Sequence, residues 1–202
     1  MRLLTLIPKS EARKKVVERR KEISAEEIRS KTKLIVERLS KLDEFIYANK
    51  IYAYISSRQG EVDTKYLIDF IVSGGKSVVL PKLNTHSKNF SHGSFLNWDN
   101  LIKNKDGYYE PPACFDDDLT DVDLIIVPAM AVSMFGQRVG YGGGYYDKLL
   151  KRTHTTKIVL AFEFQVFENI ETDAHDIRID KIITERRTIE TRKPMKRDME
   201  LL

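Results

Sequence analysis

The chain has 202 residues, a formal net charge of +4 and an isoelectric point near 9.0. This length is enough to bury a core, and a single cysteine, Cys114, excludes both an intramolecular disulfide and a cysteine metal cluster. The apolar opening over 3–7 stops at Pro8 and is too short for a signal-peptide core, and no later stretch approaches the length of a membrane span. We therefore expect a soluble, cytoplasmic protein.

Basic residues are concentrated near the start of the chain. Between Lys9 and Arg38 there are 11 lysines and arginines against 6 glutamates. A charge run of this kind is usually a solvated helix face, although it also fits a nucleic-acid-binding arm or the site of one anionic ligand. The charge pattern alone leaves these alternatives open.

Two helices are predicted at the start of the chain. Ser10 can cap the first, and Ser24–Glu27 has the form of a capping box that would start the second. The residues expected to be buried are Ala12, Val16, Val17 and Ile23 in the first helix and Ile28, Leu34, Ile35, Leu39 and Leu42 in the second.

After Asn49, short β-rich runs alternate with helical segments. We predict strands over 51–55, 77–80, 123–127, 158–162 and 182–183, and helices over 64–72 and 145–151, with Pro81 ending the second strand. Apolar strands separated by helices indicate the α/β class, with a mostly parallel open sheet and helices on both faces. We expect one domain over 1–202, with a core from 9 to 190 and a loosely held tail from 191 to 202.

The segment 84–121 is less regular and carries several aromatic residues before Pro111-Pro112. It is predicted to be a hairpin or flap packed over the sheet. Ligands of parallel sheets bind beyond the carboxyl ends of the strands. The loops after Ile55, Leu80 and Val127 should therefore meet at the ligand-binding edge.

The most informative motif is the run RVGYGGGYYDK over 138–148, which places four glycines between Arg138 and a Tyr-Tyr-Asp-Lys cluster. Glycine permits positive φ and close approach of the backbone to a ligand. The order strand, loop, glycine turn, helix directs loop amides and a helix dipole at one point, which favours phosphate. The spacing is neither a P-loop nor a dinucleotide fingerprint. A plain glycine-rich surface loop is the alternative, but it would lack the charges of Arg138 and Asp147.

Other candidate residues have weaker individual signals. Lys9 and Arg13 are one helical turn apart and suit phosphate, although surface charge is the simpler explanation unless the first helix packs beside the glycine loop. Glu61 precedes a helix capped by Asp63 or Thr64 and lies at the predicted edge, where its carboxylate can accept hydrogen bonds from a polar heterocycle.

Magnesium and stacking partners are also predicted. Asp147 and the pair His175-Asp176 are candidate magnesium ligands, because a nucleotide-bound magnesium ion needs only one or two protein carboxylates. A turn or cap role for Asp176 and a surface position for His175 remain the alternatives. Tyr141, Tyr145 and Tyr146 can stack on a flat ligand ring or pack the helix against the core.

These motifs together resemble the 5-formyltetrahydrofolate cyclo-ligase family, also called methenyltetrahydrofolate synthetase. Its central signature RLGYGGGYYDR differs only conservatively from the run over 138–148, and the resemblance covers most of the chain, from Lys9 to about Arg187. The further matching elements are Lys9 with Arg13, Glu61–Thr64, Glu110-Pro111 and His175-Asp176. The departures are Pro128-Ala129 for Pro-Gly, Ser133 for an acidic residue, and a proline missing from Glu171–Ala174.

The resemblance implies an ATP-dependent, magnesium-requiring enzyme that closes 5-formyltetrahydrofolate to 5,10-methenyltetrahydrofolate and releases ADP and phosphate. Arg138 is the catalytic candidate. The residues implied for ATP are Lys9, Arg13, Arg138, Val139, Gly140, Tyr141, Gly142, Gly143, Gly144, Tyr145 and Tyr146; those for the folate are Glu61, Tyr141, Gly142, Gly143, Gly144 and Tyr145; those for Mg²⁺ are Asp147 and Asp176.

We expect a monomer whose partners are these small molecules, without nucleic acid or membrane. One competing hypothesis keeps the nucleotide site and changes the acceptor molecule. Another takes the basic front end as a nucleic-acid-binding arm on an inactive fold, but the retained Arg138, glycines and Asp147 argue against it, and no ladder of exposed aromatics is present to stack bases.

Overall fold

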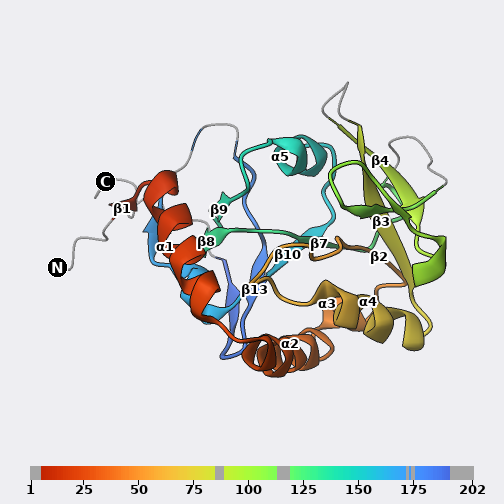
Figure 1. The fold of residues 1–202 in the computed structure, drawn as a ribbon, viewed down its shortest axis with the longest axis horizontal. Coiled ribbons are helices and arrows are strands. Elements are labelled where there is room, and N and C mark those ends of the chain that lie inside the picture. The colour runs from red at the N-terminus through yellow and green to blue at the C-terminus, as the bar shows by residue number, and fades with distance from the viewer. Residues whose placement is uncertain (1–5, 85–88, 113–118, 172, 174–175, 192–202) are drawn as a thin grey trace.

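The computed structural model describes residues 6–84, 89–112, 119–171, 173 and 176–191. Its main sheet has the strand order β14-β13-β10-β7-β2-β3-β4, in which β13, β10, β7, β2 and β3 are parallel and the two edge strands are antiparallel (Figure 1). The strands are β2 Lys50–Tyr52, β3 Ser77–Asn84, β4 Asn89–Ser94, β7 Leu124–Val127, β10 Thr156–Leu160, β13 Lys181–Ile183 and β14 Thr188–Glu190. The predicted α/β class is confirmed.

Helices cover both faces of this sheet (Figure 1). α2 Ala25–Leu39, α3 Asp43–Ile46 and α4 Thr64–Ser73 pack on one face, and α5 Tyr145–Leu150 packs on the other, while α1 Lys9–Glu22 lies beside the sheet. The residues of β7 alternate between two cores: Leu124 and Ile126 join the cluster that includes α2 and α4, while Ile125 and Val127 join the cluster that includes α5. A strand buried on both sides must be apolar throughout, which explains the Leu-Ile-Ile-Val run.

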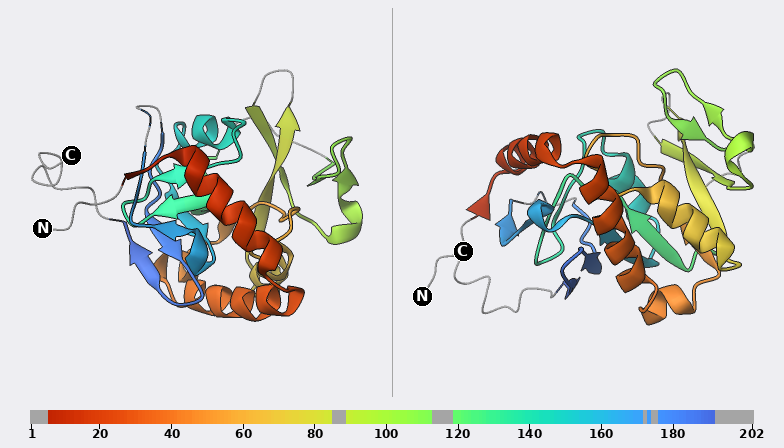
Figure 2. Two further views of the ribbon diagram at one scale, coloured as in Figure 1. Left: turned by 60° about the vertical axis from the view of Figure 1, so that its left-hand side comes forward. Right: turned by 60° about the horizontal axis from the view of Figure 1, so that its bottom comes forward.

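Smaller sheets extend the molecule on either side of the main sheet. They contain β1 Leu6–Ile7 with β12 Asn169–Ile170, β8 Ala131–Ser133 with β9 Arg138–Val139 and β11 Val166–Phe167, and β5 Ile102–Lys103 with β6 Tyr109–Glu110. Helix α1 packs on the sheet of β8 and β9 (Figure 2). Its Ala12 and Val16 are buried in one cluster with Met130 and Val139. This packing places α1 next to the glycine run that follows β9.

Two of the three predicted helix caps are confirmed. Ser24 and Glu27 form the reciprocal capping box of α2, and the Asp63 side chain accepts from the backbone amides of Lys65 and Tyr66 at the start of α4. The predicted Ser10 cap is wrong. Helix α1 begins two residues earlier than this cap requires, at Lys9, and Pro8 holds the N-cap position at φ −60°.

Two predictions of burial are also wrong. Val17 and Leu34 are 42% and 46% exposed. Each lies one position from a buried residue, Val16 or Ile35, and one residue turns a helix by about 100°. The other predicted core residues of α1 and α2 are buried or partly buried.

The segment after β3 differs from the prediction. Strand β3 does not end at Pro81 but continues to Asn84, because its pairing with β2 stops at Val79 and beyond that point only β4 is its partner. A proline is tolerated where one strand edge has no neighbour. The insertion does form a hairpin, but β4 extends the edge of the sheet instead of lying over its face, and the β5–β6 hairpin contacts β3 nearby.

Some predictions lie outside the described residues, namely those for Cys114, His175 and the tail from 192 to 202. Within the described part, no helix combines the length and the apolar character that crossing a membrane requires.

Candidate active site

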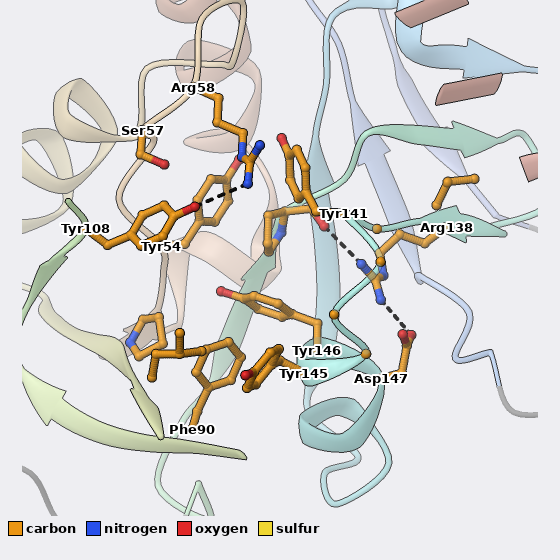
Figure 3. A pocket seen from close by; sticks show the side chains of 18 of the residues that line it. Tyr54, Ser57, Arg58, Phe90, Tyr108, Arg138, Tyr141, Tyr145, Tyr146 and Asp147 are labelled. Atoms are coloured by element: carbon orange, nitrogen blue, oxygen red, sulfur yellow. Dashed lines mark hydrogen bonds and ion pairs between the residues drawn. The ribbon is translucent and has the colours of Figure 1, made fainter. Parts of the chain in front are cut away.

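A cavity of about 670 Å³ lies at the carboxyl ends of β2, β3 and β7 (Figure 3). Ile55 and Pro128 line it from the loops that follow β2 and β7. Pro81 also lines it, but from within β3, so the loop expected directly after Leu80 is replaced by a continuing strand. Apart from His175, which lies outside the described residues, the residues proposed from the sequence for a ligand also line it: Lys9, Arg13, Glu61, Arg138, Val139, Gly140, Tyr141, Gly142, Gly143, Gly144, Tyr145, Tyr146, Asp147 and Asp176. Residues separated by more than one hundred positions in the chain thus share one cavity.

The glycine run has the backbone that its sequence predicts. Gly142 and Gly144 have φ values of 103° and 70°, a region that side chains with a Cβ rarely adopt, and Gly144 is the N-cap of α5. The other two glycines provide space: a Cβ on Gly140 would lie 2.8 Å from Nη1 of Arg138, and one on Gly143 would lie 2.8 Å from the Tyr145 ring. The glycines thus supply two positive-φ positions and leave room for the side chains of Arg138 and Tyr145.

Arg138 contacts both Pro128, directly after β7, and Asp147, in the first turn of α5. Its side chain is 3% exposed; Nη1 donates to the Pro128 carbonyl at 3.3 Å, and Nη2 contacts Oδ1 of Asp147 at 2.6 Å. Its buried Nε has no hydrogen-bond partner in the part of the chain that is described. The Pro128 carbonyl and the Asp147 carboxylate thus hold the guanidinium in place at the lining of the cavity.

Helix α1 supplies two further cations. Nε of Arg13 donates to the carbonyl of Gly140 at 3.1 Å, so α1 does pack beside the glycine loop, the condition that gives the Lys9 and Arg13 pair its weight. Nζ of Lys9 contacts Asp176 at 2.5 Å and Asp173 at 2.6 Å. Burial would lower the pKa of Lys9, but the hydrogen bonds to Asp173 and Asp176 outweigh it and raise the pKa, so the lysine remains charged.

The two predicted magnesium ligands, Asp147 and Asp176, line the same cavity, and each contacts a cation. The backbone amide of Asp173 also donates to Asp176, at 2.8 Å. Among the described residues, no group of three or more acidic, histidine or cysteine side chains is arranged to hold a metal. Two separate carboxylates nevertheless suffice for an ion that shares its coordination with phosphate and water.

Glu61 is held from several sides. It is 8% exposed, and one of its oxygens accepts from the backbone amides of Ser57 and Arg58 at 2.9 and 3.1 Å. The other oxygen accepts from the hydroxyl of Tyr141. Burial raises the pKa of Tyr141, and the negative charge of Glu61 raises it further, so this phenol stays protonated and acts as a donor.

Aromatic side chains form another part of the lining. The Phe90 ring on β4 lies 5.4 Å from the ring of Tyr145 and 5.1 Å from that of Tyr146, measured between centroids (Figure 3). Tyr146 also packs on the core cluster around α5, and its buried hydroxyl has no partner within the described residues. Packing of the helix start is thus confirmed for Tyr146, while stacking of a ligand ring on these tyrosines stays a prediction.

Sequence reasoning missed several residues of this site. Arg20 on α1 is 6% exposed and donates to the Tyr141 hydroxyl at 2.9 Å. Arg58 lies over the Tyr141 ring, 4.5 Å from its centroid, and donates to the hydroxyl of Tyr108 at 3.2 Å (Figure 3). Arg20 had a usable signal, because it lies seven residues, or two helical turns, after Arg13.

A parallel sheet with a charged, glycine-lined cavity beyond its strand ends defines the class as an α/β enzyme. The family model described as 5-formyltetrahydrofolate cyclo-ligase matches residues 7–185. The chain belongs to the 5-formyltetrahydrofolate cyclo-ligase family.

Individual relatives agree with this assignment. The chain is 29% identical to the 5-formyltetrahydrofolate cyclo-ligase of Escherichia coli K12 over 177 residues, which covers 83% of this chain and 94% of the relative. It is 28% identical to a probable 5-formyltetrahydrofolate cyclo-ligase of Caenorhabditis elegans over 181 residues, covering 83% and 87% of the two chains.

The fold of the chain is also similar to that of solved structures. The 5,10-methenyltetrahydrofolate synthetase of Aquifex aeolicus matches with a TM-score of 0.80 and 35% identity, over 93% of this chain and 95% of that one. The corresponding protein of Mycoplasma pneumoniae, with a TM-score of 0.67 and 20% identity over 88% and 98% of the chains, supports the fold alone.

Proposed function

We propose that this enzyme uses ATP to close 5-formyltetrahydrofolate to 5,10-methenyltetrahydrofolate, releasing ADP and phosphate. The family catalyses the ATP-dependent conversion of the first folate into the second. The observation that carries the proposal is the single cavity that brings the cations of α1, Arg138, the glycine loop, Glu61 and two carboxylates together beside aromatic rings.

ATP is assigned to the charged part of the cavity. The backbone of the glycine loop and the three cations Lys9, Arg13 and Arg138 offer donors and positive charge to a triphosphate. We assign Arg138 to the transferred phosphoryl group, because its guanidinium lies at the cavity lining between the glycine loop and Asp147.

The carboxylates of Asp147 and Asp176 fit a magnesium ion that arrives with the nucleotide. Such an ion supplies positive charge to phosphate oxygens and takes only one or two protein carboxylates. Lys9 and Arg138 now contact these carboxylates at 2.5 and 2.6 Å. In the proposed complex the two cations turn to phosphate oxygens, and the carboxylates turn to the metal.

The folate is assigned to the edge where Glu61 and Tyr141 meet the aromatic rings. Glu61 can accept from the N–H groups of a pterin ring, and Tyr145 lies where a flat ring would be in contact with the glycine loop. In the proposed complex the formyl group lies near the terminal phosphate.

The proposed reaction needs no general base at its first step. The formyl oxygen attacks the terminal phosphorus of ATP, the bond from that phosphorus to the ADP oxygen breaks, and ADP leaves. The neighbouring folate nitrogen then attacks the formyl carbon, loses its proton, and the carbon–oxygen bond breaks as phosphate departs. Both steps depend on positioning and charge neutralisation, which this cavity provides.

We further propose that the enzyme acts as a monomer in the cytoplasm on small molecules alone. Its single cysteine suits a reducing compartment. Lys9, Arg13 and Arg20 are directed to the cavity and its loop, which weakens the interpretation of α1 as a nucleic-acid-binding arm.

The test mixes the protein with Mg²⁺, ATP and 5-formyltetrahydrofolate and follows the near-ultraviolet absorbance of the methenyl product. We expect product only when all three are present, with ADP formed in step with it. ADP release with another acceptor and none with 5-formyltetrahydrofolate would instead favour a different substrate, and salt-sensitive RNA binding without ATP turnover would favour the nucleic-acid arm.

A further inference from the structure

Arg20 is a buried cation that contacts Tyr141 of the glycine loop and lies close to Glu61. Its side chain is 7% exposed; Nη1 lies 2.9 Å from the Tyr141 hydroxyl and 3.8 Å from Oε1 of Glu61, and Nη2 lies 3.4 Å from the carbonyl of Ala129. Arg20 is not in the lining of the cavity itself. It therefore lies behind the pair Tyr141 and Glu61, on the side away from a ligand.

The contact with Arg20 determines the direction of the neighbouring hydrogen bond. A guanidinium only donates, so the phenol oxygen of Tyr141 must accept from Arg20 and direct its own proton to Glu61. The other oxygen of Glu61 accepts from two backbone amides. The three side chains thus form a directed chain in which each donor faces an acceptor.

The surrounding backbone is shaped to admit Arg20. Gly60 has φ 72°, and a Cβ at this position would lie 2.6 Å from both Cβ and Cγ of Arg20. The glycine therefore lets α1 approach the loop that carries Glu61. Nε of Arg20 is buried without a partner among the described residues.

We propose that Arg20 is a positioning residue for the folate edge of the site. By donating to Tyr141 and compensating the charge of Glu61, it holds a residue of the glycine loop and the carboxylate in one arrangement. This inference rests on the proposed function, in which Tyr141 and Glu61 contact the folate. Arg20 itself touches neither substrate.

The test compares Arg20→Met, which keeps the apolar stem, with Tyr141→Phe and with the double variant. The KM for 5-formyltetrahydrofolate should rise about 10- to 100-fold in Arg20→Met, the range that loss of a hydrogen bond to a charged group gives, while the KM for ATP changes much less. If Arg20 acts through the hydroxyl, the double variant should be no worse than Tyr141→Phe alone. Arg19→Met is the matched control, because Arg19 is exposed and pairs only locally with Glu22.

The outcomes separate the two proposals. A wild-type protein without methenyl product contradicts the proposed function, whereas an active wild type with unchanged folate KM in Arg20→Met overturns the role of Arg20. Additive losses in the double variant, or equal rises in both KM values, would also overturn it, since they indicate general damage. Thermal unfolding checks that the variants fold; if Arg20→Met does not, Tyr141→Phe alone must still raise the folate KM for the proposal to stand.

Discussion

The cavity has two walls that are built from different interactions. The charged wall consists of Lys9, Arg13, Arg138, Asp147 and Asp176, joined by ion pairs and by a contact from α1 to the glycine loop. The aromatic wall consists of Phe90, Tyr108, Tyr145 and Tyr146, from β4, the β5–β6 hairpin and the start of α5. The first suits a polyanion with its metal and the second a flat ring, so substitutions in the two walls should affect different substrates.

The largest expected effect is at Arg138. Replacing it by alanine removes the cation assigned to the transferred phosphoryl group, and we expect kcat to fall about 1,000-fold, as for other arginines with this role. Folate binding, measured directly by calorimetry, should weaken far less. Arg186→Ala, at an exposed position of the same residue type, is the control. Unchanged turnover in Arg138→Ala would remove Arg138 from the mechanism.

Asp147→Asn tests the metal in the charged wall. The substitution keeps the size of the side chain but removes its charge, and the concentration of Mg²⁺ needed for half-maximal activity should rise about 10- to 100-fold. Binding of Mn²⁺ in the presence of a nucleotide, followed by electron paramagnetic resonance, gives a second readout. Asp99→Asn, at an exposed site outside the cavity, should change neither quantity. An unaltered metal requirement in Asp147→Asn would contradict the assignment.

Phe90→Ala tests the aromatic wall. Loss of its ring contacts with Tyr145 and Tyr146 should raise the KM for 5-formyltetrahydrofolate about 2- to 10-fold. The KM for ATP should change less, because the ring contacts of Phe90 in the described part of the chain are with Tyr145 and Tyr146 and not with the charged wall. Leu96→Ala is a suitable control, since Leu96 is 69% exposed on the segment after β4. A larger change for ATP than for folate would contradict the division into two walls.

The smallest expected effect is the contribution of Lys9 to the stability of the folded protein at alkaline pH. Its pKa is raised above the ordinary value of 10.5, so the lysine stabilises the folded protein at lower pH and loses this contribution as pH rises through the folded pKa. Lys9→Gln should lower the free energy of unfolding by less than about 1 kcal/mol, and therefore lower Tm only slightly. This difference between wild type and variant should shrink only above about pH 10.5. Lys15→Gln, which removes an exposed pair with Glu11, is the control. A difference that already vanishes near neutral pH would contradict the retained charge.

The sheet and the position of the site could be predicted from the sequence, because each depends on the composition of one short segment. Apolar runs such as 124–127 had no alternative to a doubly buried strand, and the glycine run had few alternatives to a ligand loop. Because both follow from local composition, the position of the cavity could be predicted without coordinates. The binding roles of its residues stay predictions.

Other features depend on packing that one segment does not reveal. Arg20 lies between Arg19, which is exposed, and Lys21, so its burial follows only from how α1 meets Gly60 and Tyr141. The continuation of β3 through Pro81 depends on which edge of the strand lacks a neighbour. In the sequence, Phe90 is one of several aromatic residues in an irregular segment. Its place in the site follows only from the pairing of β4 with β3, which brings it next to Tyr145.

Lys9, Arg13 and Arg20 lie along one side of α1 and each has a partner outside the helix. Their common orientation restricts insertions and deletions within α1. One inserted or deleted residue between Lys9 and Arg20 would turn one of these two residues by about 100° relative to the other. Arg20 and Lys9 could then no longer both reach their partners, Tyr141 and Asp176. Homologous enzymes that keep these contacts should therefore show gaps in the β5–β6 hairpin more readily than in this helix.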